Sequence, residues 1–329
     1  MKYKYELICP YFGQLPNNFQ LWLESCKYNT DFHFIVFTND NTKYNIPNNV
    51  DINILSFEDF KKKIQSKFNF RISLDNPYKL CDFKVTYGYV FEDILNCEYW
   101  GYCDMDLIFG NIKKFLPNKK YSKISHEGHF CLIKNNKKYR EAFMSQGNSK
   151  INYITILSSK VHFGFDEIGE YGINKLFENN NYSIYSFEKH VADINCKFEG
   201  LNITSGNGGK YKTNFGKRVF EFNKGSIVGY NLHNAMIEKE EYAYIHFQKR
   251  KMLIDINPKY IMKFLILHHS IENKYDYVID KMFIEEKQPK KKFNLKLNIK
   301  LKKKAILVRI KRKLFYKKRG YGSYEKNNG

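Results

Sequence analysis

The sequence lacks the features that would place it in several large classes of protein. Its seven cysteines are scattered and include no Cys-x-x-Cys pair, which argues against a disulfide framework or a zinc site and fits a reducing compartment. No apolar run reaches the length of a membrane span, and the first residues are too polar for a signal peptide. A glycine-rich phosphate loop is also missing near the N-terminus, which disfavours a nucleotidyltransferase. We therefore expect a cytoplasmic protein, either soluble or peripheral to a membrane.

Acidic residues are scarce at one end of the chain. The formal net charge is +21, and residues 287–329 hold 17 Lys or Arg against one acid, which leaves +5 for residues 1–286. A body of this length with 43% hydrophobic residues can bury a sizeable core. We expect one domain over residues 1–285, followed by a basic tail over residues 286–329 that needs its own explanation.

Strand and helix patterns alternate in the first part of the chain. Dense apolar runs at Tyr5–Cys9, Phe32–Thr38 and Val50–Leu55 predict strands, whereas Leu15–Tyr28 has helical spacing. Another helix is expected to begin after Ser56, a good N-cap residue. This alternation predicts an α/β fold with a mixed, mostly parallel sheet flanked by helices.

Three later segments also carry a structural prediction. The apolar face of Pro77–Leu95 predicts a long helix that leads into a strand at Tyr99–Cys103. The segment Asn202–Asn214 is rich in Gly, Asn, Thr and Ser and is predicted as a loop. The alternating pattern of Phe293–Lys302 predicts a strand.

Two aspartates, Asp104 and Asp106, follow the strand at Tyr99–Cys103. Residues two apart in extended chain point the same way, and burying two unpaired carboxylates together is costly. A divalent cation removes that cost, and hard oxygen ligands suit Mg²⁺ or Mn²⁺. The alternative, without a functional role, is a surface turn that contains two aspartates.

His246 closes a predicted strand at Tyr242–Phe247 and is followed by Lys249 and Arg250. An imidazole is a good third ligand for Mn²⁺, and adjacent cations would clamp phosphates. The alternative is a turn with solvated charges.

Three charged residues lie on the predicted helix before the aspartates. Lys79 and Asp82 are three residues apart and share a face, while Lys84 diverges from them. In the functional interpretation they approach a nucleotide. In the alternative, Lys79 and Asp82 form an ordinary surface ion pair.

Acidic residues also occur in a glycine-rich segment, where Asp166 and Glu167 are candidates for a base that deprotonates an attacking hydroxyl. Asp166 is the stronger candidate, with a helix-capping role as its rival. His129 and Glu127 are weaker candidates, which would line a sugar pocket and reach its hydroxyl groups.

Four segments resemble bacterial GT-A glycosyltransferases of the kind that build capsule or lipopolysaccharide chains. They are Cys9–Gly13 (CPYFG), Pro77–Lys84 (PYKLCDFK), Trp100–Asn111 (WGYCDMDLIFGN) and Tyr244–Met252 (YIHFQKRKM), the last two being the more specific. The resemblance covers about residues 3–255. It implies a GT-A-like fold with an Asp-x-Asp motif.

The same resemblance implies a site and a reaction. The metal, Mn²⁺ or Mg²⁺, would be held by Asp104, Asp106 and His246, and Asp104 would also face the ribose. The enzyme would move a hexose such as galactose from a UDP-sugar to a lipid-linked or growing polysaccharide acceptor, and the resemblance around His246 favours retention of configuration. The nucleotide-sugar would further contact these residues: Pro10, Tyr11, Phe12, Thr38, Asn39, Lys79, Asp82, Lys84, His129, Lys249 and Arg250.

The basic tail mixes aliphatic and cationic residues over Ala305–Lys318. This pattern predicts a basic amphipathic helix on an anionic membrane surface, at the inner face of the cytoplasmic membrane. The rival interpretation is a non-enzymatic protein whose tail binds nucleic acid or a membrane. The aliphatic residues favour the membrane over nucleic acid, since phosphate contacts need no apolar stripe.

Overall fold

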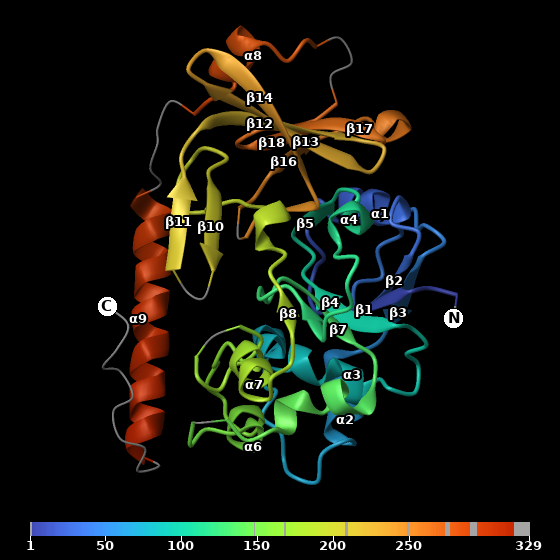
Figure 1. Ribbon diagram of the computed structural model, residues 1–329, viewed down its shortest axis with the longest axis vertical. Helices are drawn as coiled ribbons and strands as arrows, with labels where there is room; N and C mark the ends of the chain where they lie inside the picture. The colour runs from blue at the N-terminus through green and yellow to red at the C-terminus, as the bar shows by residue number, and fades with distance from the viewer. Residues whose placement is uncertain are drawn as a thin grey trace.

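The computed structural model describes residues 2–147, 149–167, 169–207, 210–248, 250–273, 277–289 and 295–318. It shows a central sheet with helices around it, a second sheet stacked at one end, and a long C-terminal helix along one side (Figure 1). Among the described residues, no helix is both long enough and apolar enough to cross a bilayer.

The central sheet has seven strands in the order β3-β2-β1-β4-β7-β6-β8. Neighbouring strands from β3 to β4 are parallel, as are β6 and β8, and β7 is antiparallel to both of its neighbours. The predicted mixed, mostly parallel sheet flanked by helices is therefore confirmed. The strands are β1 Tyr5–Tyr11, β2 Phe32–Thr38, β3 Val50–Ile54, β4 Tyr99–Cys103, β6 Lys123–Ile124, β7 Phe130–Lys134 and β8 Ile184–Tyr185.

Alternation along each strand fills two cores, one on each face of the sheet. In β2, Phe34 and Val36 pack in one core, and Ile35 and Phe37 pack in the other. Successive strand residues point to opposite faces, so a strand made almost wholly of apolar residues is buried on both. The covering helices are α1 Phe19–Lys27, α2 Phe57–Gln65, α4 Ile112–Phe115, α5 Lys137–Arg140, α6 Tyr153–Leu157 and α7 Ile173–Asn179, with shorter turns η3 Ala142–Met144 and η4 Glu188–His190.

The long helix predicted over Pro77–Leu95 is wrong. The segment instead forms two 3₁₀ turns, η1 Pro77–Asp82 and η2 Lys84–Thr86, followed by the short α3 Tyr87–Val90. A regular helix turns 100° per residue and would point Lys84 about 160° away from Asp82. In the structure both side chains are buried, and the broken backbone makes this possible.

A second sheet was not anticipated from the sequence. Its strands run β14-β13-β12-β17-β18-β16, and one face packs on Leu21 of α1 and on Ile108 of the short strand β5 Leu107–Phe109. The strands are β12 Lys217–Asn223, β13 Ser226–His233, β14 Met236–Tyr242, β16 Leu253–Asp255, β17 Lys263–Ile266 and β18 Ser270–Glu272, with η5 Pro258–Tyr260 between them and α8 Lys281–Glu286 on the other face.

The loop predicted over Asn202–Asn214 is also wrong, because this polar segment forms a hairpin. Strands β10 Ile203–Asn207 and β11 Lys210–Asn214 pair antiparallel, with Ile203 opposite Asn214. Strand formation depends on cross-strand pairing more than on composition, so a Gly- and Asn-rich segment conceals it.

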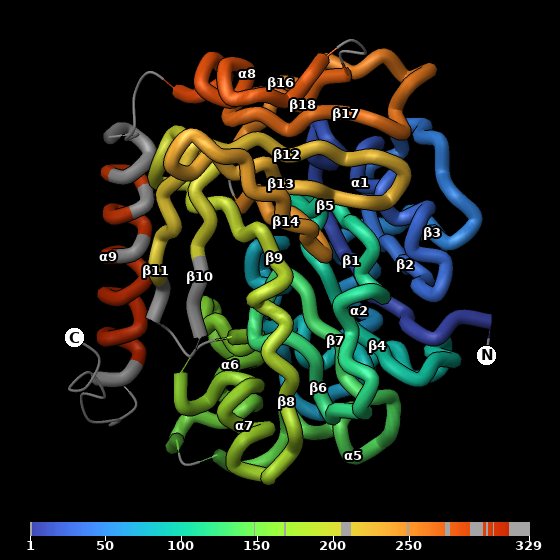
Figure 2. Tube along the Cα trace, turned by 45° about the horizontal axis from the view of Figure 1, so that its top comes forward, coloured from blue at the N-terminus to red at the C-terminus, as the bar shows by residue number. Residues whose placement is uncertain are grey.

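The tail forms one helix, α9 Leu295–Lys318, so the strand predicted over Phe293–Lys302 is wrong for Leu295–Lys302. Lys and Leu are good helix formers, which favours a helix here. The β10–β11 hairpin lies beside α9 (Figures 1 and 2), but its two strands form a separate two-stranded sheet. Arg312 of α9 donates hydrogen bonds to the carbonyl oxygens of His162 and Phe163, at 3.0 and 2.8 Å.

Candidate functional site

Asp104 lies directly after β4, at the carboxyl end of a central strand, where ligands bind in open α/β sheets. Its backbone N–H donates to the His129 carbonyl at 2.9 Å. The Lys84 ammonium lies 2.6 Å from the Asp104 carboxylate and also donates to the Gly128 carbonyl at 2.7 Å. Burial would raise the pKa of Asp104, but the Lys84 charge outweighs it and the pKa is lowered. Asp104 is therefore an ionised carboxylate.

A small three-stranded sheet, β5-β15-β9, brings the C-terminal half of the chain to these aspartates. β15 Tyr244–His246 lies between β5 Leu107–Phe109 and β9 Val191–Asp193. The register places His246 opposite Leu107 on one side and opposite Asp193 on the other. His246 thus meets Asp106, whose side-chain oxygen is 3.5 Å from His246 Nε2.

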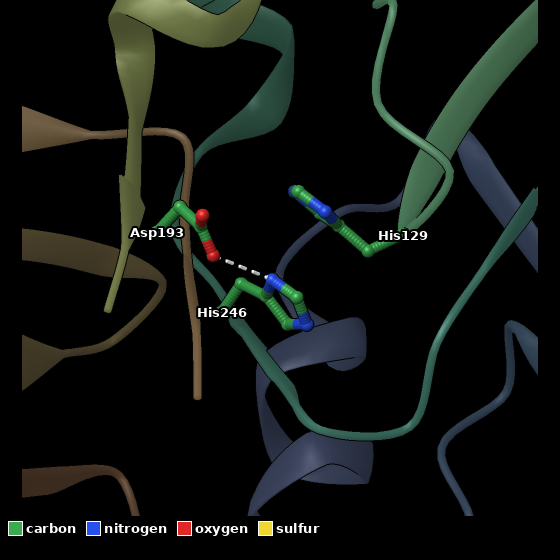
Figure 3. A group of neighbouring side chains, drawn as sticks. All are labelled: His129, Asp193 and His246. Atoms are coloured by element: carbon green, nitrogen blue, oxygen red, sulfur yellow. Dashed lines mark hydrogen bonds and ion pairs between the residues drawn. The ribbon is translucent and has the colours of Figure 1, made fainter. Parts of the chain in front are cut away.

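Asp193 holds the His246 ring from behind. His246 Nδ1 lies 2.7 Å from a carboxylate oxygen of Asp193 (Figure 3). The Gln248 side-chain amide donates to the same carboxylate at 3.0 Å. A carboxylate on one ring nitrogen fixes the orientation of the imidazole and leaves the other nitrogen for a ligand. Sequence reasoning missed Asp193. The sequence feature that could have identified Asp193 is its position at the end of a short apolar strand.

The charge of His246 is set by its carboxylate neighbours. Burial lowers its pKa, but Asp106 and Asp193 outweigh burial and raise the pKa well above the ordinary value. A cation that binds His246 must therefore displace a proton. The ring of His129 stacks on that of His246, with centroids 4.0 Å apart (Figure 3). Burial and the His246 charge lower the pKa of His129 to about 3, so His129 is neutral.

Three groups of side chains within the described residues are arranged so that they could hold a metal ion. In the first, Asp104, Asp106 and His246, the ligand atoms lie within 4.8 Å of one another. Two carboxylates and one imidazole form a donor set that suits Mn²⁺ or Mg²⁺. The structure thus brings together the three residues predicted as metal ligands. The other two groups are His129, Asp193 and His246, and Glu127, His129 and Glu167.

Two clefts meet at Asp104 and Asp106. The larger has a volume of about 840 Å³ and the smaller about 450 Å³, and both are also lined by Tyr78 and Lys84. The larger cleft is lined by six residues predicted to contact the nucleotide: Pro10, Tyr11, Phe12, Lys84, Asp104 and Arg250. The smaller one is lined by the remaining acidic and histidine candidates: His129, Asp166, Glu167 and His246.

Residues 7–275 match the model of a protein family described as a family of unknown function, DUF6625. The chain belongs to this family. No curated protein matches the sequence.

Several solved structures show a weak similarity to the chain. The galactosyltransferase LgtC, in complex with donor and acceptor sugar analogs, is 10% identical with a TM-score of 0.33, and the match covers 57% of this chain and 75% of LgtC. The apo-form glycosyltransferase GlyE of Streptococcus pneumoniae TIGR4 is 14% identical with a TM-score of 0.30, over 56% of this chain and 46% of GlyE. The inositol-1-phosphate CTP transferase of T. maritima is 9% identical with a TM-score of 0.27, over 57% of this chain and 86% of that enzyme.

Lys79 and Asp82 do not form the surface ion pair that the sequence allowed. Their side chains are 3% and 0% exposed, and Lys79 Nζ lies 2.7 Å from Asp82. Neither residue lines either cleft, which also corrects the expectation that they approach a nucleotide. Asp82 instead accepts hydrogen bonds from the backbone N–H groups of Phe163, Gly164 and Phe165.

The remaining predicted contacts have different surroundings. Thr38 is buried, and the Asn39 side chain accepts from the Gly13 N–H at 2.8 Å, so both lie outside the lining of the two clefts. Lys249 lies outside the described residues. Arg250 lines the larger cleft, but its guanidinium donates to backbone carbonyls of two separate segments: Asn195, Phe198, Glu199 and Gly200 in one, and His268 in the other.

Asp166 is buried beside Lys84, with a carboxylate oxygen 3.5 Å from Lys84 Nζ. Burial raises its pKa, Lys84 opposes this, and the nearby acids including Glu167 add to the rise, which brings the pKa to about 8. Glu167 accepts a hydrogen bond from the Gly128 N–H at 2.6 Å. Asp166 therefore exchanges its proton near neutral pH, as a general base should.

Proposed function

We propose that the protein is a metal-dependent glycosyltransferase of the GT-A type that moves a hexose from a UDP-sugar to a lipid-linked or growing polysaccharide acceptor. One observation carries the proposal: Asp104, Asp106 and His246 converge at the junction of two clefts, although they come from distant parts of the chain. A partly exposed mixed set of carboxylates and imidazole has a clear chemical use as a cation site.

The larger cleft suits the nucleotide. Tyr11 and Phe12 supply aromatic walls, and the cleft extends to Asp104 and Asp106. A divalent ion held by these aspartates and His246 supplies neutralisation of the charge that grows on the diphosphate leaving group. Lys84 keeps Asp104 ionised and fixed, so the chain's own part is to pre-organise the ligand set.

The smaller cleft suits the transferred sugar and the acceptor. The buried Asp166 and the half-buried Glu167 supply acceptors for sugar hydroxyl groups. With retention of configuration, which we favour, Asp166 orients a hydroxyl, since no base is strictly required. With inversion, Asp166 takes the proton of the attacking hydroxyl.

The rival function, a basic protein that binds nucleic acid without catalysis, fits the clefts poorly. Six acidic side chains line the smaller cleft, which disfavours a phosphate backbone there: Asp104, Asp106, Glu127, Asp166, Glu167 and Asp193. The positive charge lies mainly in residues 287–329.

Binding of UDP is the direct test of the proposed function. We expect calorimetry to show that UDP binds in the presence of Mn²⁺ and that EDTA weakens binding at least about tenfold, because an ion held by Asp104, Asp106 and His246 would neutralise charge on the diphosphate. Turnover of UDP-sugars would then be screened under the same two conditions. Binding of UDP that EDTA leaves unchanged would contradict the metal-dependent site.

We also propose that α9 binds an anionic membrane surface at the inner face of the cytoplasmic membrane. At 100° per residue, Ile306, Ile310 and Leu314 share one face, while Arg312 and Phe315, which contact the body, lie on another. The side chains at 306, 310 and 314 are 55%, 47% and 56% exposed. An exposed aliphatic stripe among cations is the pattern of an interfacial helix.

Vesicle sedimentation tests this role of the tail. The full chain is expected to sediment with phosphatidylglycerol vesicles more than with neutral vesicles, and Ile306→Asn combined with Ile310→Asn is expected to reduce binding severalfold. Ile94→Asn, on an exposed side chain outside α9, is the matched control. Binding that the double substitution leaves unchanged, or that favours DNA over vesicles, would contradict the proposal.

A further inference from the structure

A second acidic group lies on the wall of the smaller cleft, apart from the proposed metal ligands. It forms where the segment between β6 and β7 meets the segment before α7. The Gly128 N–H donates to Glu167, and a Cβ atom at Gly128 would lie 2.5 Å from an Asp166 oxygen. A larger residue at position 128 would collide with Asp166, so glycine allows the two segments to approach closely. This close approach brings Glu127 next to Glu167. The ligand atoms of Glu127, His129 and Glu167 lie within 4.8 Å of one another.

His129 is the observation that points to a ligand at this group. Its side chain is buried, with 6% of the residue exposed, and its Nε2 has no hydrogen-bond partner among the described residues. A buried polar atom without a partner is costly, so such atoms usually have an unseen water, ion or ligand beside them. His129 lines the smaller cleft together with Glu127 and Glu167.

The charge of the group also calls for a cation. Lys84 is already engaged by Asp104, the Gly128 carbonyl and Asp166. The Glu127 and Glu167 carboxyl groups are hydrogen-bonded to each other, and none of the described cationic side chains is bonded to them. Ligand atoms on one ion, each roughly 2.1 Å from it, lie at most about 4.2 Å apart, so a small inward movement closes the set.

We propose that Glu127, His129 and Glu167 form a second divalent-cation site that shares no ligand with the group of Asp104, Asp106 and His246. One nitrogen and two carboxylates suit Mn²⁺ or Zn²⁺ better than Ca²⁺. The stacked rings of His129 and His246 make the two groups neighbours. A cation here binds a hydroxyl oxygen of whatever molecule occupies the smaller cleft, and this does not depend on the proposed transfer being correct.

The experiment is a Mn²⁺ titration of the metal-free full-length protein, with free Mn²⁺ followed by electron paramagnetic resonance. The wild type is expected to bind two equivalents. Combining Glu127→Gln with Glu167→Gln, or changing His129→Gln alone, is expected to remove one equivalent. Asp106→Asn is expected to remove the other. Glu170→Gln changes an exposed acid on the same segment and is the matched control, expected to keep both.

Each outcome has a separate meaning. A wild type that binds a single equivalent, lost in Asp106→Asn and kept in the Glu127/Glu167 variant, would overturn the second site and leave the proposed function intact. Loss of both equivalents in the Glu127/Glu167 variant while thermal melting and circular dichroism match the wild type would show one shared site, which also overturns it. The His129→Gln variant guards against misfolding of the double variant, since the two must lose the same equivalent.

Discussion

Asp106→Asn is expected to lower metal-dependent turnover of a UDP-sugar by roughly a hundredfold or more, the cost of removing one group that stabilises transition-state charge. The substitution keeps the shape of the side chain but removes a charge that faces the proposed ion. It leaves the His246 imidazole, whose Nε2 is 3.5 Å from Asp106, without one of its two carboxylate partners. The measurement is initial rate against Mn²⁺ concentration.

The same variant has a readout that needs no substrate. Asp106 is the first of the groups that raise the pKa of His246 against the effect of burial, so its loss should move that pKa downward. NMR titration of the metal-free protein would follow it. Asp93→Asn, an exposed aspartate outside both clefts, is the matched control and should match the wild type in both measurements. Unchanged turnover in Asp106→Asn, with turnover still stopped by EDTA, would move the metal away from this group.

The parts of the fold that follow local rules were predictable. Strand β2 reads as a strand because Phe34, Val36 and their neighbours leave it no polar face. The cap at Ser56 was predictable for a similar reason, since its side chain accepts the Asp59 N–H as an N-cap should. The grouping of Asp104, Asp106 and His246 was predicted from their positions at strand ends together with the family resemblance.

The features that could not be predicted from the sequence depend on contacts between distant segments. Asp193 holds His246 only because β9 pairs with β15, and nothing near Asp193 in the chain marks that pairing. The β10–β11 hairpin has a loop-like composition, and its register is a property of the pair. Arg250 sits among cations in the sequence, but the structure surrounds it with backbone carbonyls that no local pattern reveals.

The buried contacts of Asp82 were also not predictable from the residues near it in the sequence. Asp82→Ala is expected to destabilise the protein by about 3–5 kcal/mol, the usual cost of removing one partner of a buried ion pair. The substitution leaves the Lys79 ammonium, 3% exposed, without its counter-charge. It also leaves the N–H groups of Phe163, Gly164 and Phe165 without their acceptor. Urea unfolding of the variant and the wild type measures the loss.

Two further variants separate the ion pair from other causes. Asp75→Ala breaks an exposed ion pair, in which a carboxylate oxygen of Asp75 lies 3.1 Å from Lys160 Nζ. This substitution should lower the free energy of unfolding by at most about 1 kcal/mol. Adding Lys79→Met to Asp82→Ala removes the stranded charge and should recover part of the stability, but the three N–H groups stay unpaired. A loss below about 1 kcal/mol for Asp82→Ala would contradict the assignment. Because Asp166 follows the anchored backbone directly, Asp82 is also what fixes the wall of the smaller cleft, a role that an exposed ion pair could not have.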